Sequence, residues 1–374
     1  MGENGRSELV GVASGPLAGI KVIEFAGIGP GPFCAMLLSD LGAEVLRIDR
    51  RGALPPAELD LTTRGRDVIE LDLKDEADRA LCRDAIAVSD VLIEGFRPGV
   101  MERLGLGPVE MLAANPRLIY GRMTGWGQDG PLAHRAGHDI NYIALTGVLA
   151  AMGSPDAPPP PPLNLVGDLG GGALYLAFGI AAALYERDRS GLGQVIDAAI
   201  VDGSASLMTV FHGLAMRHPK MIERGNNPLG GAKANYRCYA CADGRYIAVG
   251  ALEPQFHAEL LSRMGLSHDL DEREEETALL TAFAARPRDD WMTLFSNCDA
   301  CVSPVLDLNE TCSDPHLKAR DVHVEIDGVM QPGVAPRFSR TPGQIQGGVP
   351  ASPADTVDRL RVWCARVGGD NPPE

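Results

Sequence analysis

The sequence lacks any uninterrupted apolar run that approaches the roughly 20 residues of a membrane-spanning helix. It also lacks the pattern of a signal peptide, because residues 1–14 are polar and glycine-rich, with neither a basic start nor an apolar middle. From these absences we expect a flexible tail over residues 1–14, a cytoplasmic location and no membrane partner.

Basic residues are scarce relative to acidic ones. The 374 residues include 34 Lys and Arg against 50 Asp and Glu, which gives a formal net charge of −16. This charge disfavours non-specific binding to nucleic acid, so no nucleic-acid partner is expected. With 45% hydrophobic and 22% charged residues the composition is that of a globular protein, and the length allows one large domain or two ordinary ones.

The eight cysteines lack the spacing of a zinc ribbon. Two Cys-x-x-Cys pairs occur, Cys238/Cys241 and Cys298/Cys301, but about sixty residues separate them, where zinc ribbons have roughly 15–20. Cys238 and Cys241 also fall in a predicted hairpin, where they would point to opposite faces of the sheet. Small buried thiols are the favoured interpretation, zinc is the weaker alternative, and no metal is expected.

Hydrophobic patterning predicts a parallel sheet in the first third of the chain. A buried strand, a Gly/Pro loop, a helix and a second strand follow one another between residues 17 and 48, which indicates a βαβ unit. The pattern then repeats, with strands expected at 20–25, 44–48, 68–71, 91–93 and 118–120 and helices at 33–41 and 75–88. A doubly wound, Rossmann-like α/β domain is predicted, with ligands at the carboxyl ends of its strands.

The composition changes after the first two thirds of the chain. A glycine-rich start leads into a strong helical pattern over 167–185, residues 223–234 form a Gly/Asn/Pro linker, and a hairpin follows around Ala242–Gly244. We expect a large domain at 15–222 and 320–374, a smaller α+β domain at 235–314, a second linker at 315–319, and a final helix at 354–367.

The loop from Gly27 to Pro32 stands where a dinucleotide-binding fingerprint would stand, after a strand and before a helix. The third glycine of that fingerprint is replaced by Pro32, and Asp49, at the position of a ribose-binding acid, is followed by Arg50 and Arg51. NAD binding is therefore disfavoured, and a plain structural turn stays open. The cations Arg50, Lys74, Arg97 and Arg103 each follow a predicted strand, which suggests a phosphate-binding rim.

Three further segments carry chemistry-bearing residues: 136–142 (AGHDINY), 164–172 (NLVGDLGGG) and 250–254 (GALEP). Together with 27–32, 94–106 and 121–130 they resemble the α-methylacyl-CoA racemases of the family III CoA-transferase fold. The resemblance extends over about residues 15–340, in order and spacing as well as identity. It implies a large Rossmann-like domain closed by the C-terminal segment, and two chains interlocked as a homodimer. Each active site would then lie between the large domain of one chain and the small domain of the other.

Carried onto this sequence, the resemblance implies that His138 and Asp168 are catalytic bases and that Glu253 orients His138. The substrate would be an acyl-CoA thioester, in fatty acid metabolism, with no further cofactor. The implied contacts to CoA are Arg50, Leu71, Asp72, Leu73, Lys74, Gly95, Phe96, Arg97, Arg103, Gly137, His138, Asp139, Ile140, Asn141 and Tyr142.

The residue types suit racemisation of a 2-methylacyl-CoA. A proton must leave one face of the α-carbon and another must arrive on the opposite face, so two groups are the economical solution. Histidine has both protonation forms available near neutrality, and burial beside Leu165, Val166 and Leu169 would keep Asp168 partly protonated. We also expect Gly170–Gly172 to open a helix whose free N–H groups stabilise the enolate.

Other interpretations stay open at this point. Asp168 alone would most often be read as a helix N-cap, and Tyr142 as a packing residue. The main rival function is a CoA-transferase on the same fold, in which Asp168 would form a covalent anhydride. Such transferases carry no general-base histidine, which favours the racemase. A catalytically silent acyl-CoA-binding or dehydrogenase-like protein is the other rival, and the acyl chain is not specified.

Overall fold

The computed structural model describes residues 14–52, 60–350 and 355–365, and the chain divides into two compact units. The first comprises Met1–Leu145, Pro162–Leu207 and Asp321–Glu374, and the second comprises Thr146–Pro161 and Met208–Arg320. Residues 146–161 and 208–222, expected in the large domain, therefore belong to the second unit. Apart from Ser14, the expected tail over 1–14 lies outside the described residues.

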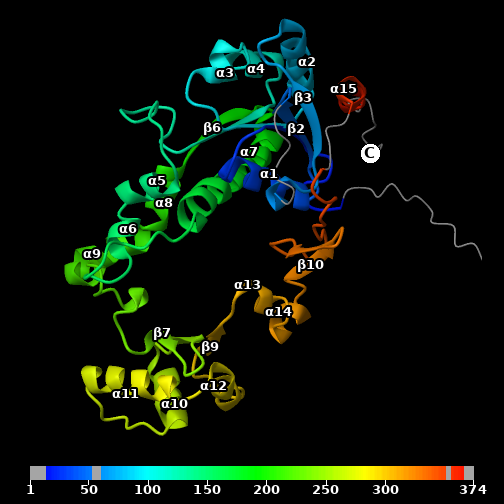
Figure 1. The fold of residues 1–374 in the computed structure, drawn as a ribbon. Coiled ribbons are helices and arrows are strands. Elements are labelled where there is room, and N and C mark those ends of the chain that lie inside the picture. The colour runs from blue at the N-terminus through cyan, green and yellow to red at the C-terminus, as the bar shows by residue number, and fades with distance from the viewer. Residues whose placement is uncertain (1–13, 53–59, 351–354, 366–374) are drawn as a thin grey trace, which may run out of the picture. The chain divides into compact units, whose positions relative to one another are not determined.

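The first unit is built on a six-stranded parallel sheet of order β3-β2-β1-β4-β5-β6 (Figure 1). Its strands are β1 (Lys21–Phe25), β2 (Glu44–Arg50), β3 (Asp67–Leu71), β4 (Val91–Glu94), β5 (Ile119–Thr124) and β6 (Gln194–Ala199). The five predicted strands are confirmed. Strand β6, whose first residues are exposed at the sheet edge, was not expected. The order reverses between β1 and β4, and such a switch point is where these sheets bind ligands.

Both faces of this sheet are covered, because successive residues of each strand point to opposite sides. Val22 of β1 packs in one apolar core with α1 (Pro30–Asp40) and α7 (Leu174–Ser190). Ile23 packs in the other core with α2 (Glu76–Ala87). The doubly wound α/β prediction and both predicted helices are thus confirmed.

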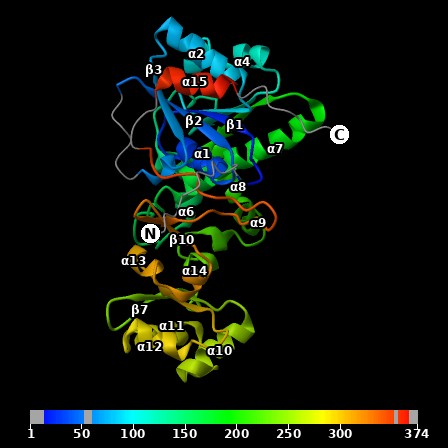
Figure 2. The same cartoon turned by 90° about the vertical axis from the view of Figure 1, so that its right-hand side faces the viewer.

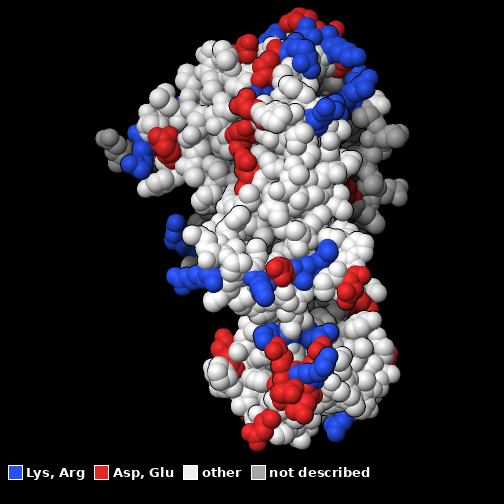
Figure 3. Space-filling model, turned by 90° about the vertical axis from the view of Figure 1, so that its left-hand side faces the viewer, with Lys and Arg blue, Asp and Glu red and all other residues white. Residues whose placement is uncertain are grey.

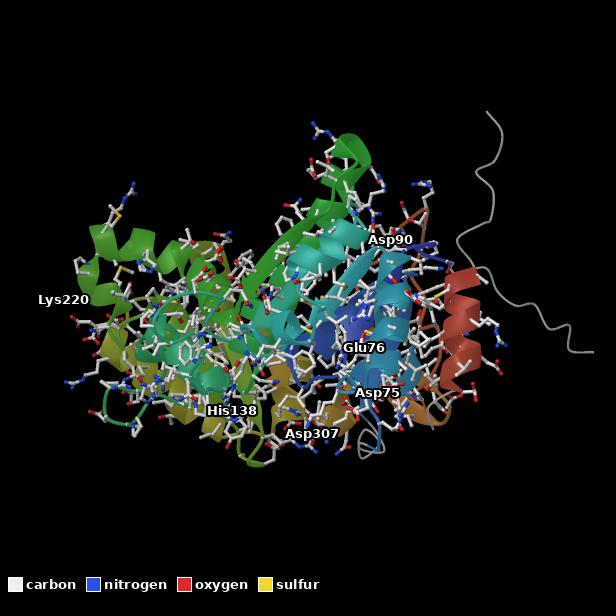
Figure 4. All side chains as sticks on the ribbon, turned by 90° about the horizontal axis from the view of Figure 1, so that it is seen from above. Asp75, Glu76, Asp90, His138, Lys220 and Asp307 are labelled. Carbon is white, nitrogen blue, oxygen red and sulfur yellow. The ribbon has the colours of Figure 1, made fainter. Side chains whose placement is uncertain are left out.

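The C-terminal helix α15 (Thr356–Ala365) completes the second of these cores and lies beside α2 and β3 (Figure 2). Trp363 is buried, its indole Nε1 donates to Ser89 Oγ at 3.0 Å, and its carbonyl accepts from Lys21 Nζ at 2.8 Å. Asp90, labelled in Figure 4, accepts from the backbone of Lys21 and from Arg187 of α7. The expected closure of the large domain by the C-terminal segment is therefore present.

Helix α7 continues a π-helical segment, η2 (Leu165–Ala173), and the two together are long and apolar enough to cross a membrane by length and composition. The helical pattern predicted over 167–185 is confirmed, but the search for uninterrupted apolar runs did not identify it as a candidate membrane span. One side of α7 packs on the sheet, where Leu176 and Ile180 are fully buried. The other side leaves Phe178 and Tyr185 largely exposed.

The second unit contains the antiparallel sheet β7-β8-β9, formed by β7 (Tyr236–Ala240), β8 (Tyr246–Gly250) and β9 (Val302–Val305). Its core side packs on α10 (Pro254–Met264), α11 (Glu272–Ala284) and α12 (Arg288–Leu294), with Tyr239 stacked on Phe283 at 4.8 Å. The predicted hairpin and the α+β character are confirmed.

All eight cysteines are free. Cys241 is buried, but the expectation of buried thiols is wrong for Cys238 and Cys301, which are exposed. In the part of the chain that the structure describes, no three His, Cys, Asp or Glu residues gather into a metal-binding group.

The shorter elements connect these layers. In the first unit they are η1 (Leu61–Thr63), α3 (Val100–Arg103), α4 (Pro108–Ala114), α5 (Asp139–Leu145), α8 (Ile200–Leu207), β10 (His323–Ile326) and β11 (Val329–Pro332). In the second unit they are α6 (Val148–Ala151), α9 (Thr209–Arg217), η3 (Pro219–Ile222), η4 (Pro228–Gly230), α13 (Leu308–Thr311) and α14 (Pro315–Ala319).

Candidate active site

A cavity of about 620 Å³ lies within the first unit at the carboxyl ends of β1, β4 and β5. It is lined by the loop after β1, the loop after β4, the end of β5 and the segment before α5, together with Asp168 of η2. This is the edge of the sheet on which the topology predicts a ligand.

His138 lines the cavity and immediately precedes α5; it is labelled in Figure 4. Its backbone N–H donates to Asn141 Oδ1 at 3.1 Å, and its carbonyl accepts from the backbone N–H of Asn141 at 2.8 Å. These two bonds fix the backbone of His138, while its side chain stays exposed to the cavity. Asn141 therefore supports His138 and does not itself line the cavity.

Tyr142 forms one wall of the cavity by packing closely on glycine backbone. Its hydroxyl donates to the carbonyl of Gly137 at 2.5 Å, and its ring meets Trp126 edge-on at 4.7 Å between centroids. A Cβ at Gly125 would lie 2.0 Å from the Tyr142 ring, so only glycine allows this packing. The interpretation of Tyr142 as a packing residue is confirmed.

Asp168 lies half-buried inside η2, and its side chain lines the cavity beside the Gly27–Pro32 loop. Its backbone N–H donates to Asp139 Oδ1 at 2.7 Å. Burial raises the pKa of Asp168, and the Asp139 carboxylate raises that pKa further, opposed by a long bond from Asn164 and by His138. A raised pKa favours the protonated form of Asp168, which is the form that a catalytic acid requires.

The structure excludes one alternative interpretation of this segment, Asp168 as an N-cap, and contradicts one expectation, free N–H groups at Gly170–Gly172. Helical structure begins at Leu165, so Asp168 is the fourth residue of η2 and not an N-cap. In a π-helix each N–H bonds the carbonyl five residues earlier, as Leu169 N does to Asn164 at 3.1 Å. The N–H groups of Gly170–Gly172 are therefore part of the helical ladder and are not free to bind an enolate.

The Gly27–Pro32 loop lines the cavity and leads directly into α1, with prolines in the first turn of that helix. Gly29 has a φ of +73°, and a Cβ added there would lie 3.1 Å from Asp168 Oδ2. Asp49 is buried and accepts from Arg47 Nε at 3.0 Å. Since Asp49 is engaged inside the protein, the NAD interpretation loses its ribose-binding acid.

A buried carboxylate holds the loop after β4 against the cavity. Glu94 Oε2 accepts from the backbone N–H of Phe96 at 2.7 Å, and Glu94 Oε1 accepts from Arg122 Nε at 2.9 Å. Arg122 also donates to Glu102 of α3 at 2.8 Å. Burial raises the pKa of Glu94. This network positions Gly95, Phe96 and Arg97 at the cavity.

The structure brings together seven of the fifteen expected CoA contacts. Those that line the cavity are Gly95, Phe96, Arg97, Gly137, His138, Asp139 and Tyr142. Those that do not line it are Arg50, Leu71, Asp72, Leu73, Lys74, Arg103, Ile140 and Asn141. Among these, Arg50, Lys74 and Arg103 are exposed, whereas the side chain of Leu71 is buried in the core and has no access to a ligand.

The segment from Asp72 to Lys74, directly after the end of β3 at Leu71, is tied to α2. The backbone N–H of Asp72 donates to Asp78 Oδ2 at 2.6 Å, and Arg79 donates to the carbonyls of Leu73 and Lys74. These bonds hold the turn whether or not a ligand is present.

Glu253 belongs to the second unit, where it is the exposed N-cap residue of α10. Its side chain makes no capping hydrogen bond, so the carboxylate is not used to stabilise that helix. Its assignment as the partner of His138 stays a prediction.

Among the cavity-lining residues to which sequence reasoning gave no role, Arg135 and Trp126 have side chains suited to binding a ligand. Arg135 lies three residues before His138 in the same loop, so its nearness to the expected base was the available signal. Trp126 follows β5 directly, at the strand end where ligands are expected.

The match to a known family covers most of the chain. The model of the family described as CoA-transferase family III matches residues 17–356. The mouse protein named alpha-methylacyl-CoA racemase is 42% identical over 363 residues, covering 93% of each chain, and the human protein of that name is 42% identical over 335 residues, covering 87% of each chain. A crystal structure of a CAIB/BAIF family protein from Brucella suis superimposes with a TM-score of 0.81 at 26% identity, covering 94% of this chain and all of that one.

Proposed function

The chain belongs to CoA-transferase family III, and from this premise we propose that it is an isomerase that racemises the α-carbon of 2-methylacyl-CoA thioesters. The relatives at 42% identity over about nine tenths of the chain carry the name of that activity. The single structural observation that supports it most is that His138 and Asp168 line the same cavity at the switch point of the sheet.

The two bases divide the proton transfer between them. Neutral His138 removes the α-proton, the electrons of the C–H bond move into the thioester carbonyl to give an enolate, and protonated Asp168 delivers a proton to the opposite face of the same carbon. In the other direction the two roles exchange. The raised pKa of Asp168 supports its role as donor. The overall change neither gains nor loses electrons, so the proposal includes no cofactor.

For the CoA moiety we propose contacts along the loops that line the cavity. Arg97 is exposed at the cavity, and Glu94 fixes the backbone beside it. Arg135 is a second exposed guanidinium on the same cavity, so the two cations offer charge-assisted bonds to phosphate in a chain whose net charge is −16. In Figure 3 acidic and basic side chains lie scattered around wide uncharged areas, so no extended basic surface serves that purpose on the face shown.

We further propose that the protein acts as a homodimer. The side of α7 that faces away from the sheet carries Leu174 (51% exposed), Phe178 (74%), Ala181, Ala182 and Tyr185 (69%) at helical spacing. A helix that is apolar on both sides requires a second covering surface. Phe178→Glu is expected to convert a dimer to a monomer in light scattering, whereas Val109→Glu, at an isolated exposed position on α4, is expected to leave the dimer intact. A wild-type monomer would contradict this proposal.

The alternative function, transfer of CoA through a covalent aspartyl anhydride, is less supported, because it gives His138 no task. The deciding experiment incubates the protein with (S)-2-methylacyl-CoA in D₂O and follows the α-proton by NMR together with chiral analysis of the product. Deuterium uptake with loss of chirality is expected. The protein is instead a transferase if three results coincide: no deuterium enters the substrate, an added carboxylic acid acquires CoA, and hydroxylamine traps the enzyme at Asp168.

A further inference from the structure

One side chain connects the two proposed bases. Asp139 follows His138 in the chain, and its carboxylate Oδ1 accepts from the backbone N–H of Asp168, 29 residues away, at 2.7 Å. Asp139, His138 and Asp168 all line the same cavity. A short path of covalent bonds and one hydrogen bond therefore joins the two proposed bases.

This connection fills a specific need of the π-helical segment. The first N–H groups of a helix have no acceptor within that helix, and Asp168 N is among them in η2. The Asp139 carboxylate supplies the missing acceptor, and a hydrogen bond to a charged group is stronger than one between neutral groups. The position of Asp168 thus depends on a side chain outside its own helix.

The glycine before Asp168 makes room for this contact. A Cβ at Gly167 would lie 2.2 Å from Asp139 Oδ1 and 2.9 Å from Ile143 Cγ2, and Ile143 is fully buried. Ile143 therefore has no freedom to move aside, and any larger residue at position 167 would push the carboxylate away from Asp168. Gly167 does not have a positive φ, so its role here is steric.

We propose that Asp139 is a positioning residue that fixes the spacing of His138 and Asp168, and so couples proton removal on one face of the α-carbon to proton delivery on the other. This inference rests on the proposed racemase function and adds a requirement to it. When the spacing is lost, the enolate is reprotonated by the base that formed it. The α-proton then exchanges with solvent, but the configuration is retained.

The measured quantity is the ratio of inversion to exchange in D₂O, from chiral analysis and NMR of the same sample. In Asp139→Ala this ratio is expected to fall at least about tenfold relative to wild type, since displacements of the order of 1 Å cost about 10²-fold in rate. Asp139→Asn keeps an oxygen acceptor for Asp168 N and is expected to keep the ratio within about twofold, because a neutral acceptor still makes the hydrogen bond.

Gly167→Ala is expected to reproduce the effect of Asp139→Ala by displacing the carboxylate while Asp139 itself is retained, and it tests the inference if Asp139→Ala does not fold. Two matched controls are expected to keep the wild-type ratio. Asp129→Ala removes an exposed aspartate outside the cavity, and Gly213→Ala adds a Cβ that meets nothing within 4 Å.

An unchanged ratio in both Asp139→Ala and Gly167→Ala would overturn the inference, as would a parallel loss of exchange and inversion with the ratio intact, which is the signature of a merely structural role. Failure of the wild-type protein to exchange the α-proton would instead refute the proposed function. The two failures are therefore distinguishable.

Discussion

The interior of the cavity and the expected phosphate-binding rim are constructed differently. His138 and Asp168 are fixed through backbone hydrogen bonds to Asn141 and Asp139. The rim cations Arg50, Lys74 and Arg103 are exposed, and none of them lines the cavity. Proton transfer needs groups held within a fraction of an ångström, whereas a flexible cation can still attract a phosphate from a distance. Substitution of His138 or Asp168 should therefore lower kcat, and substitution of a cation that attracts the phosphates should raise KM for the acyl-CoA.

The largest expected effect comes from Asp168→Asn, which removes one of the two proton-transferring groups. Racemisation should fall by about 10²–10⁴-fold, the usual contribution of a general acid or base, with little change in affinity for the acyl-CoA. Initial rates from chiral chromatography measure the loss, and Asp129→Asn serves as the control. A loss confined to KM would show that Asp168 binds substrate and does not transfer protons.

The next largest effect is expected at Arg97, which the sequence grouped with the rim cations but which lines the cavity in the structure. Arg97→Ala should raise KM for the acyl-CoA by about tenfold, as expected for the loss of one charge-assisted hydrogen bond, and leave kcat within about twofold. The control is Arg83→Ala, because Arg83 pairs on the surface of α2 with Glu76, labelled in Figure 4. An equal effect of the two substitutions would place Arg97 outside the CoA site.

A smaller effect is expected at the rim itself. Arg50→Ala should raise KM by about two- to threefold at low salt, and the difference should vanish near 0.5 M salt, because exposed charges beyond a few ångströms are screened there. Steady-state kinetics at two ionic strengths measures both values. A salt-independent rise as large as that of Arg97→Ala would mean that Arg50 contacts the substrate directly, and the contrast between the two regions would disappear.

The smallest effect concerns pH. The two bases share one proton in the active form, so activity falls at low pH, where both are protonated. Burial and the Asp139 carboxylate raise the pKa of Asp168, whereas the hydrogen bond from Asn164 and the charge of His138 lower it. The charge of Asp168 in turn contributes to the raised pKa of its neighbour Tyr142. Asp139→Asn removes one raising charge, so the acid limb of kcat/KM should move to lower pH. A shift to higher pH would contradict this assignment of the charges.

Local sequence signals were sufficient for the buried parts of the fold. The strands β1 to β5 each contain a short apolar stretch of two or three residues and are largely buried, and the helices α1 and α2 have regular periodicity, so both were predicted. The edge strand β6 was missed because the residues at its start face solvent. The switch point could be predicted once the strand order was known, since ligands bind there in such sheets.

The sequence predicted several residues of the candidate site, but not how the local backbone holds them. Its two bases were assigned through the resemblance, but the π-helical path of Leu165–Ala173 has no sequence signature. The expectation of free donors at Gly170–Gly172 was therefore wrong, and the alternative of an N-cap at Asp168 could not be excluded from the sequence. The contact between Asp139 and Asp168 joins segments 29 residues apart. It depends on the space left by the hydrogen atom of Gly167, which no local pattern reveals.

The most direct test of the two-base account measures deuterium exchange of each epimer of a 2-methylacyl-CoA by the single variants His138→Ala and Asp168→Asn. Each variant keeps one base, so each should exchange the α-proton of one epimer only, with retention of configuration, and the two variants should select opposite epimers. Loss of exchange for both epimers in both variants, or the same preferred epimer in each, would contradict the account.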